Sequence, residues 1–194
     1  MAETPRGDAV RLRPILGLTL VGVALVVAPV LSDHAPRLIW NASASVPVGL
    51  YALRPVGDLT IGDLVAVTPP EPLAEFITAR GYVDPGVPLL KRVAALPGTW
   101  VCRTGTTITV AGQVLGQARD RDSLGRPLPI WQGCRVVGAY EVFLMNRDAE
   151  DSLDGRYFGP LPVSSVTARI VPHWTDAAGD GRFRRPAADA AGGP

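Results

Sequence analysis

The distribution of hydrophobic and polar positions divides the chain into four parts. Residues 1–13 are polar and of mixed charge, whereas residues 14–32 contain no charged side chain. A helix of that length rises roughly 28 Å at about 1.5 Å per residue, close to the thickness of a bilayer core. The pattern therefore predicts a cytoplasmic tail (1–13), a transmembrane helix (14–32), a folded domain beyond the membrane (33–174) and a disordered tail rich in Gly, Ala, Pro and Arg (175–194).

The charges that flank the uncharged run indicate its orientation. Arg6, Arg11 and Arg13 precede the run, whereas Arg37 is the one basic residue soon after it. Positively charged flanks tend to stay in the cytoplasm. The N-terminus is therefore predicted to be cytoplasmic.

A cleavable signal peptide is the alternative interpretation, because residues 42–44 (Ala-Ser-Ala) have the small-x-small form of a cleavage site. The spacing argues against it. A stretch that includes Asp33, Arg37 and Trp40 lies before Ala42, whereas the apolar core of a signal peptide ends only a few residues before the cut. Trp40 instead fits an anchor at the membrane interface, so we predict an uncleaved helix.

Short apolar runs alternate with turn residues in the predicted domain. Such runs, bounded by Gly, Pro or Asp, are typical of strands. The predicted strands are residues 48–53, 63–67, 89–96, 100–102, 106–110, 113–115, 141–146 and 166–171. Residues 73–80 fit one short helix, and residues 116–134 fit a long polar loop. A mainly β domain with hairpin-connected strands is expected.

The overall charge excludes one class of partner. The formal net charge is +1, and the chain has no long basic run and no Gly-rich phosphate loop. A nearly neutral chain lacks the electrostatic surface that nucleic-acid binding requires. We therefore predict no nucleic-acid partner.

Cys102 and Cys134 are the only cysteines. Beyond a membrane, in an oxidising space, a disulfide is the default state of such a pair. Closing this loop would stabilise the fold by roughly 3.5 to 4 kcal/mol in the chain-entropy model. Two free buried thiols are the alternative, and a metal site would need more ligands than two cysteines supply.

The stretch from residue 41 to residue 51 places hydroxyl groups in front of a turn. Pro47 restricts the backbone of the residue before it, and Gly49 permits a close backbone approach, so Ser45 is predicted to be presented on a loop. This stretch fits a nucleophile loop. The alternative is an ordinary Ser/Ala linker that leaves the membrane.

Lys91 is the only Lys among 19 basic residues, and it lies inside an apolar run. Unlike a guanidinium, an amine can lose its proton near neutral pH, and burial favours that loss. A neutral amine can take the proton of a nearby hydroxyl, so Lys91 is a candidate general base. The alternative is a surface Lys whose stem lies over apolar neighbours.

His34 and His173 are the only histidines. One lies at the predicted membrane face and the other follows the last predicted strand, so neither is well placed for a Ser-His-Asp triad. The Cys, His and carboxylate spacing indicates no metal site, and we expect no cofactor.

Three stretches, residues 43–51, 90–98 and 151–159, together resemble the sequence boxes of type I signal peptidases, in particular the TraF-type branch of conjugative-transfer peptidases. The resemblance extends over about residues 15–174. It implies a signal-peptidase/LexA-like antiparallel β-fold for the catalytic domain.

The first two boxes carry the chemistry in that family. The resemblance implies that Ser45 is the nucleophile and that Lys91 is its general base. It also implies that Ser43 helps to form the oxyanion hole.

The third box supports the first two. The resemblance implies that Ser152 positions Lys91, and that Asp154 and Arg156 buttress the site through a charge pair. Gly155 departs from the family, which usually has a second Ser at this position.

The function implied by the resemblance is a membrane-anchored serine endopeptidase. Its substrate would be a pilin or another secretion-system precursor that carries small side chains before the cut. The enzyme would lie in the bacterial inner membrane with its catalytic domain in the periplasm. Water or an amine of the substrate would resolve the acyl-enzyme, and the sequence leaves hydrolysis and cyclisation both open.

Two other classes of protein are compatible with part of the pattern. A non-catalytic, membrane-anchored β domain that acts as an assembly adaptor would explain the apolar run and the cysteines, but not the single Lys. A self-cleaving repressor shares the Ser/Lys chemistry, but it would have a DNA-binding domain where this chain has the apolar run.

Overall fold

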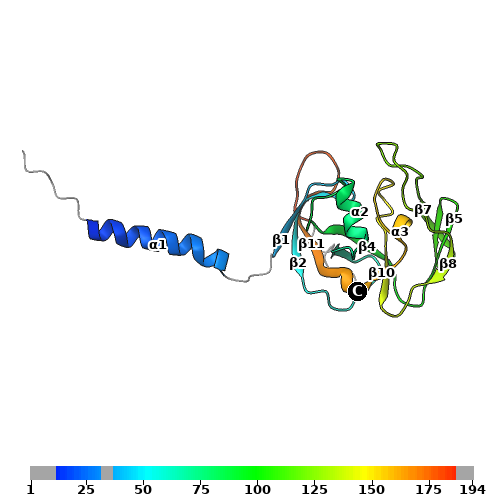
Figure 1. The fold of residues 1–194 in the computed structure, drawn as a ribbon, viewed down its shortest axis with the longest axis horizontal. Helices are drawn as coiled ribbons and strands as arrows, with labels where there is room; N and C mark the ends of the chain where they lie inside the picture. Colours follow the sequence, from blue (N-terminus) through cyan, green and yellow to red (C-terminus); the bar gives the residue numbers. More distant parts are fainter. Residues whose placement is uncertain (1–11, 32–36, 187–194) are drawn as a thin grey trace, which may run out of the picture. The chain divides into compact units, whose positions relative to one another are not determined.

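The computed structural model describes residues 12–31 and 37–186 (Figure 1). The chain separates into two units, Met1–Pro36 and Arg37–Pro194. Most of the predicted tail 1–13, the junction around residues 32–36 and the end of the predicted C-terminal tail lie outside the described residues.

The first unit contains the helix α1 (Leu12–Leu31). Its side chains are described from residue 14 to residue 28, and all of these are exposed. Over the described part of the chain, no helix reaches the length and apolarity that crossing a membrane requires. The predicted membrane crossing of residues 14–32 stays a prediction.

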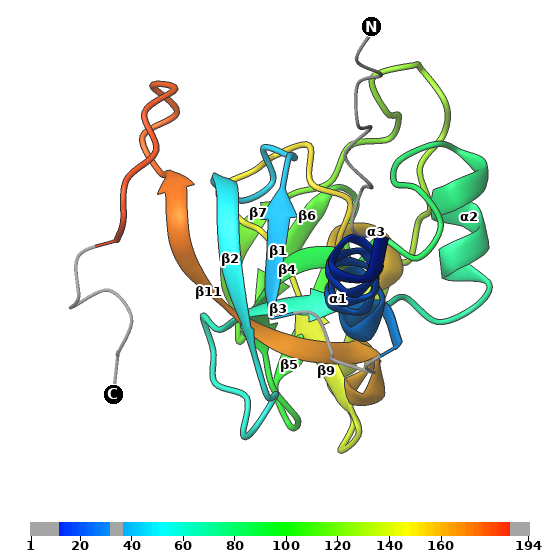
Figure 2. The ribbon, with the colours of Figure 1, turned by 90° about the vertical axis from the view of Figure 1, so that its left-hand side faces the viewer.

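The second unit is built from two antiparallel sheets. The larger sheet has seven strands in the order β1-β2-β11-β3-β4-β9-β10. Their bounds are β1 (Leu38–Asn41), β2 (Val48–Arg54), β3 (Leu64–Val67), β4 (Leu89–Ala95), β9 (Glu141–Leu144), β10 (Leu161–Pro162) and β11 (Val166–Asp176). Figure 2 shows β1, β2 and β11 side by side.

The smaller sheet has four strands in the order β7-β6-β5-β8. Their bounds are β5 (Trp100–Thr104), β6 (Thr107–Val110), β7 (Gln113–Gln117) and β8 (Gly133–Val136). Three short helical segments complete the unit: α2 (Leu73–Ala79), α3 (Gly155–Phe158) and the 3-10 turn η1 (Val163–Ser165). The predicted mainly β, antiparallel architecture is confirmed.

Strand β9 joins the two sheets because its side chains alternate between two cores. Val142 and Leu144 pack in the core of the large sheet, with Ile77 of α2. Phe143, together with Met145 directly after the strand, instead packs in a second core, formed with apolar residues of the small sheet. This period of two is that of an extended strand buried on both faces.

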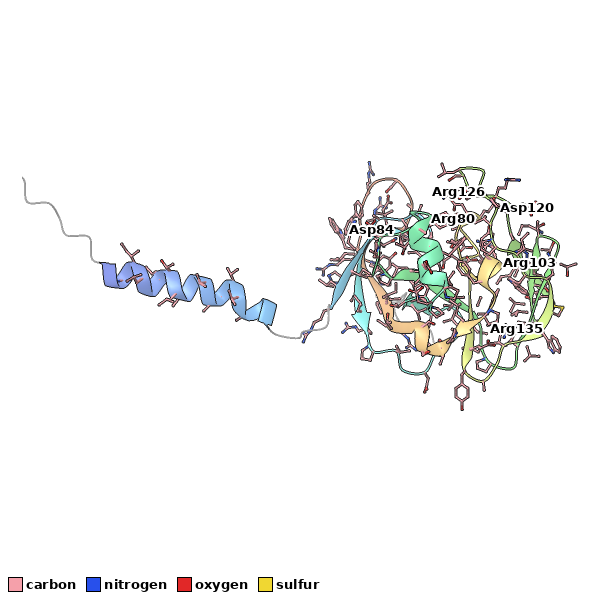
Figure 3. The ribbon with its side chains drawn as sticks, viewed as in Figure 1. Arg80, Asp84, Arg103, Asp120, Arg126 and Arg135 are labelled. Carbon is pink, nitrogen blue, oxygen red and sulfur yellow. A yellow bond between two sulfur atoms is a disulfide. The ribbon has the colours of Figure 1, made fainter. Side chains whose placement is uncertain are left out.

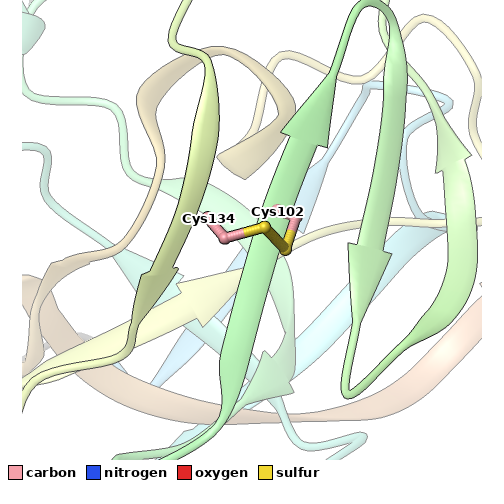
Figure 4. Close-up of a disulfide and its surroundings, with 2 residues drawn as sticks. All are labelled: Cys102 and Cys134. Carbon is pink, nitrogen blue, oxygen red and sulfur yellow. A yellow bond between two sulfur atoms is a disulfide. The ribbon is translucent and has the colours of Figure 1, made fainter.

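The cysteines form a disulfide between adjacent strands of the small sheet. Cys102 of β5 and Cys134 of β8 are directly opposite partners in the ladder, and their sulfur atoms are bonded (Figure 4). The predicted disulfide is confirmed. Strand β8 was not predicted, because all four of its residues are exposed and show no apolar alternation.

The described C-terminal region differs from the predicted disordered tail. Strand β11 continues to Asp176, and the chain then turns back so that Thr175 and Arg184 form an isolated antiparallel bridge. Phe183, within this returning segment, packs against two tryptophans. These contacts order residues 177–184 even though their composition is rich in Gly, Ala and Arg. We name residues 176–184 the C-terminal hairpin.

Candidate active site

The loop between β1 and β2 carries the predicted nucleophile, and Asn41 at the end of β1 organises it. The Asn41 Nδ2 donates hydrogen bonds to the carbonyl oxygens of Ser43, Val46 and Pro47, at 2.7, 3.1 and 3.1 Å. Its Oδ1 accepts from the backbone N–H of Ser43 at 3.1 Å and from the Ser43 hydroxyl at 2.9 Å. One buried amide therefore fixes the shape of the loop.

Ser43 and Ser45 point their hydroxyls at each other, with their Oγ atoms 3.1 Å apart. A hydroxyl has one proton to donate. Because the Ser43 proton is directed at Asn41, Ser45 is the donor in this contact. Both predicted residues therefore lie on one accessible loop, with Ser43 exposed and Ser45 half-buried.

The exit of the loop depends on Gly49. Its φ of 147° is unfavourable for a side chain, and a Cβ built there would lie 2.3 Å from the carbonyl oxygen of Trp174 and 2.6 Å from the Cα of Thr175. The close backbone approach predicted from the sequence is confirmed. It holds the loop that carries Ser45 against the end of β11.

Lys91 lies on β4, where it pairs with Val65 of β3. Only 5% of its surface is exposed, and its Nζ donates a hydrogen bond to the Oγ of buried Ser152 at 2.8 Å. Burial lowers the pKa of Lys91 to about 8, although the charge of Asp154 acts in the opposite direction. A surface location for this Lys is thereby excluded, and part of its population is neutral near neutral pH.

Asn146, just after β9, holds the backbone on both sides of Lys91. Its Nδ2 donates to the carbonyl oxygen of Leu90 at 3.0 Å, and its Oδ1 accepts from the backbone N–H of Arg92 at 2.9 Å. Asn146 is buried. The Asn146 side chain thus fixes the backbone position of Lys91 on β4.

The third box forms a buried charge pair behind Lys91. The Nη1 of Arg156 lies 3.2 Å from the Oδ2 of Asp154, and the two side chains are 1% and 0% exposed. The Asp154 carboxylate also caps α3 by accepting from the backbone N–H of Arg156, and it accepts from the N–H of Asn146. These bonds satisfy a carboxylate that would otherwise be costly to bury.

The guanidinium of Arg156 clamps the loop that carries Ser152. It donates to the carbonyl oxygens of Asn146, Ala149 and Ser152, at 3.0, 2.8 and 3.2 Å. Arg103 of the small sheet, labelled in Figure 3, in turn donates to the carbonyl oxygen of Arg156 at 2.6 Å. The small sheet therefore helps to position the partner of Lys91.

The departure at Gly155 has a steric cause. A Cβ at this position would lie 2.6 Å from the ring of Phe143 and 2.7 Å from the carbonyl oxygen of Leu144. Both atoms belong to β9, which is fixed between two cores. A second Ser therefore has no space here, and Ser152 is the hydroxyl that meets Lys91.

One groove of about 460 Å³ brings the predicted residues together, since Ser43, Ser45, Lys91 and Ser152 all line it. Its other walls include apolar side chains such as Ile39, Val87 and Leu90. Asp154 and Arg156 do not line the groove and instead support it from the buried side. Over the residues that the structure describes, no group of three or more His, Cys, Asp or Glu side chains is placed to hold a metal.

Asn41 and Asn146 were not predicted as site residues. Each Asn directly follows a run that ends in large apolar side chains, which is a weak signal for a buried amide at the end of a strand. Their role depends on which carbonyl and N–H groups the fold brings within reach, and this information is absent from the local sequence. The catalytic roles of the predicted residues remain predictions.

Comparison with known proteins gives a consistent family. The model of the family "Signal peptidase, peptidase S26" matches residues 12–174. A plasmid transfer protein TraF of Escherichia coli is 33% identical over 169 residues, which cover 80% of this chain and 92% of that protein. A conjugal transfer protein TraF of Agrobacterium tumefaciens (strain 15955) is 38% identical over 153 residues, covering 70% of this chain and 81% of that protein.

A crystal structure of a signal peptidase I from Enterococcus faecalis V583 aligns with 60% of this chain and 99% of its own, at 18% identity and a TM-score of 0.36. The family model covers most of the chain, and the two relatives are each more than 30% identical to it. The chain therefore belongs to the signal peptidase family, peptidase S26, and to its TraF-type branch.

Proposed function

We propose that this protein is a membrane-anchored serine endopeptidase that uses a Ser45/Lys91 dyad to process a secreted or pilin precursor in conjugative transfer. The observation that carries this function is the buried amine of Lys91, which lines the same groove as Ser45. A buried amine with a pKa of about 8 is suited to the role of a general base. The family identity supports a peptidase and, with it, a protein substrate.

The first half of the reaction forms an acyl-enzyme. In the structure the Ser45 proton is directed at Ser43, so it must first turn toward Lys91 when the substrate fills the groove. Neutral Lys91 then takes this proton, and the Ser45 Oγ attacks the scissile carbonyl. The tetrahedral intermediate collapses, and protonated Lys91 gives its proton to the leaving amine. The hydrogen bond that Lys91 donates to Ser152 leaves the lone pair of the neutral amine free for this exchange.

Oxyanion stabilisation requires a change at Ser43. In the structure its hydroxyl donates to Asn41, so the proton must rotate toward the substrate oxygen for Ser43 to act as an oxyanion donor. Asn41 would then lose one hydrogen bond while keeping the backbone contact to Ser43. The backbone N–H of Ser45 would supply the second donor, each typically contributing about 3 to 4 kcal/mol.

The second half of the reaction releases the product. A water, or an amine of the substrate itself, attacks the acyl-enzyme while Lys91 again acts as the base. Water gives a linear product, and an amine gives a cyclic one. The family resemblance implies a precursor with small side chains before the cut, and the apolar side chains that line the groove beside Ser45 are compatible with it.

The proposed location is the inner membrane, with a cytoplasmic N-terminus and a periplasmic catalytic domain. The uncharged run of residues 14–32 supports this anchor, and the helix α1 covers most of that run. The disulfide between Cys102 and Cys134 supports an oxidising compartment for the second unit.

The direct test is co-expression with a candidate pilin precursor from the same transfer locus. Cells with the wild-type chain should convert the precursor to a shorter or cyclic product, and cells with Ser45→Ala should accumulate the precursor. Ser123→Ala, which changes an exposed Ser outside the groove, is the matched control and should process normally. Normal processing and transfer with Ser45→Ala would contradict the peptidase and favour an assembly adaptor.

A further inference from the structure

A second groove, of about 470 Å³, borders the nucleophile loop. It shares only Ala44 and Ser45 with the groove that contains Lys91. Its walls are the start of β2, Arg92 of β4, the loop after β9 with Asp148 and Ala149, and the first residues of the C-terminal hairpin (176–179). The two grooves thus meet at the residue proposed to attack the substrate.

A substrate polypeptide that Ser45 cleaves must extend to both sides of this residue. The groove with Lys91 has apolar walls and contains Ser43, so it suits the small side chains before the cut and the carbonyl that becomes the oxyanion. The segment after the cut must then leave through the second groove. Ala149, Ala177, Ala178 and Gly179 line this groove, so a peptide backbone can approach its walls closely.

The hairpin that forms one wall is tied down at its base. The backbone N–H of Thr175 donates to the carbonyl oxygen of Arg184 at 3.0 Å, and the N–H of Arg184 donates back at 2.9 Å. The carboxylate of Asp176 accepts from the N–H groups of Asp180 and Gly181 at 3.0 and 2.8 Å. The turn therefore has a defined shape, and it follows directly on Thr175, which pairs with Gly49 of β2.

Phe183 attaches the hairpin to β1, the strand that leads into the loop with Ser45. Its ring centroid lies 5.6 Å from that of Trp40 and 5.1 Å from that of Trp174. Trp40 belongs to β1, directly before the Asn41 that shapes the nucleophile loop, and it also lines the first groove. Aromatic contacts of this kind contribute to packing beyond the area that they bury.

We propose that the C-terminal hairpin is a specificity-determining wall that binds the extended peptide segment following the scissile bond. This role rests on the proposed peptidase function. The hairpin is expected to favour precursors in which the chain continues beyond the scissile bond. Phe183 is expected to act indirectly, by positioning residues 176–179.

Two substrates with the same sequence before the cut separate this role from the chemistry. Both end their acyl part in Ala-Gln-Ala; one continues for several residues after the cut, and the other carries only a p-nitroanilide. Phe183→Ala should lower kcat/KM for the long peptide on the order of tenfold, mainly through KM, and should lower it much less for the anilide, which meets Phe183 only indirectly through Trp40. Phe183→Tyr should restore kcat/KM for the long peptide to nearly the wild-type value. Tyr140→Ala, which removes an aromatic side chain that is 82% exposed elsewhere, is the control and should change neither substrate.

A second variant tests the groove without touching the anchor. Ala178→Trp places a large side chain on an exposed turn residue that lines the groove. The melting temperature should not change. The variant should no longer cleave the long peptide but should still cleave the anilide. Equal losses on both substrates, or no loss on the long peptide for both variants, would overturn the hairpin's role. Failure of the wild type to cleave either substrate, or cleavage by Ser45→Ala, would instead contradict the proposed function.

Discussion

The amine of Lys91 and the hydroxyl of Ser152 meet at 2.8 Å, although 61 residues separate them along the chain. Both side chains are buried, and the hydroxyl accepts the hydrogen bond. Ser152 therefore fixes one direction of the amine, and the loop that holds Ser152 is itself clamped by Arg156.

Ser152→Ala should remove this fixed partner without changing the size of the site. The amine would gain rotational freedom and lose a buried hydrogen bond, so kcat should fall on the order of ten- to a hundredfold with little change in KM. Steady-state kinetics on the wild type and the variant measure this split. Ser164→Ala changes a Ser that lies outside both grooves and is the matched control. A kcat at the wild-type level would remove Ser152 from the site.

Asn41→Ala should disorder the nucleophile loop. Three carbonyl groups would lose the donor that Asn41 supplies. Of these three contacts the one with the Val46 carbonyl is fully buried, and leaving such a carbonyl without a partner costs about 1 to 3 kcal/mol. Asn41→Asp keeps the acceptor for Ser43 but lacks the donor. Both variants should therefore melt earlier and turn over substrate more slowly, and a thermal melt with an activity assay checks this. Wild-type stability in both variants would show that the amide does not organise the loop.

Gly155→Ser, which restores the residue common in the family, should destabilise this protein. The new Cβ would meet Phe143 and the backbone of Leu144, and overpacking of this kind costs about 1 to 3 kcal/mol. Gly138→Ser is the comparison: its nearest neighbour is the end of the Glu141 side chain, so a smaller loss is expected, limited to the hydrogen bonds of that carboxylate with Gly138 and Arg135. Denaturant unfolding of the two variants measures the difference. Equal stability of Gly155→Ser and the wild type would mean that β9 yields at Phe143.

Lys91→Met should change how the stability of the folded protein depends on pH. The pKa of Lys91 is about 8 in the folded state against an ordinary value of 10.5, so the unfolded state binds more protons between these two pH values. Stability of the wild type therefore rises with pH across this window, and the variant lacks that rise. The variant loses the hydrogen bond to Ser152 at every pH, so the pH-dependent part of the difference is the signature: the stability of the variant relative to the wild type should be highest near pH 7 and should fall toward pH 10.5. A pH-independent difference would contradict a desolvated amine.

Much of the fold could be predicted because its signals are local. The strand predicted at residues 89–96 is β4 (Leu89–Ala95), and the helix predicted at residues 73–80 is α2 (Leu73–Ala79). Their apolar runs and turn residues suffice. Strand β8 and the C-terminal hairpin are different, because they are ordered by a partner strand, a disulfide and Phe183 rather than by their own pattern.

The candidate site shows the same division. Ser45 and Lys91 stand out because a Ser before a Pro/Gly pair and a single Lys are visible in the sequence itself. Other features depend on contacts between segments that are distant in sequence or fold back on each other. Asn146 bonds to the backbone on both sides of Lys91, and Asn41 directs the Ser43 proton. Such contacts arise only after the strands have paired.

Lys91 is proposed to act as a neutral amine in this reaction. Precursor cleavage by the wild type should rise with pH through about 8, because burial lowers the pKa of Lys91 and the neutral form accumulates above that value. Lys91→Arg keeps the positive charge but cannot lose its proton in this range. The decisive measurement is therefore cleavage by both proteins across this pH range, with a melting curve for each. The dyad predicts a folded variant without cleavage at any pH, and near-wild-type cleavage by folded Lys91→Arg would contradict it.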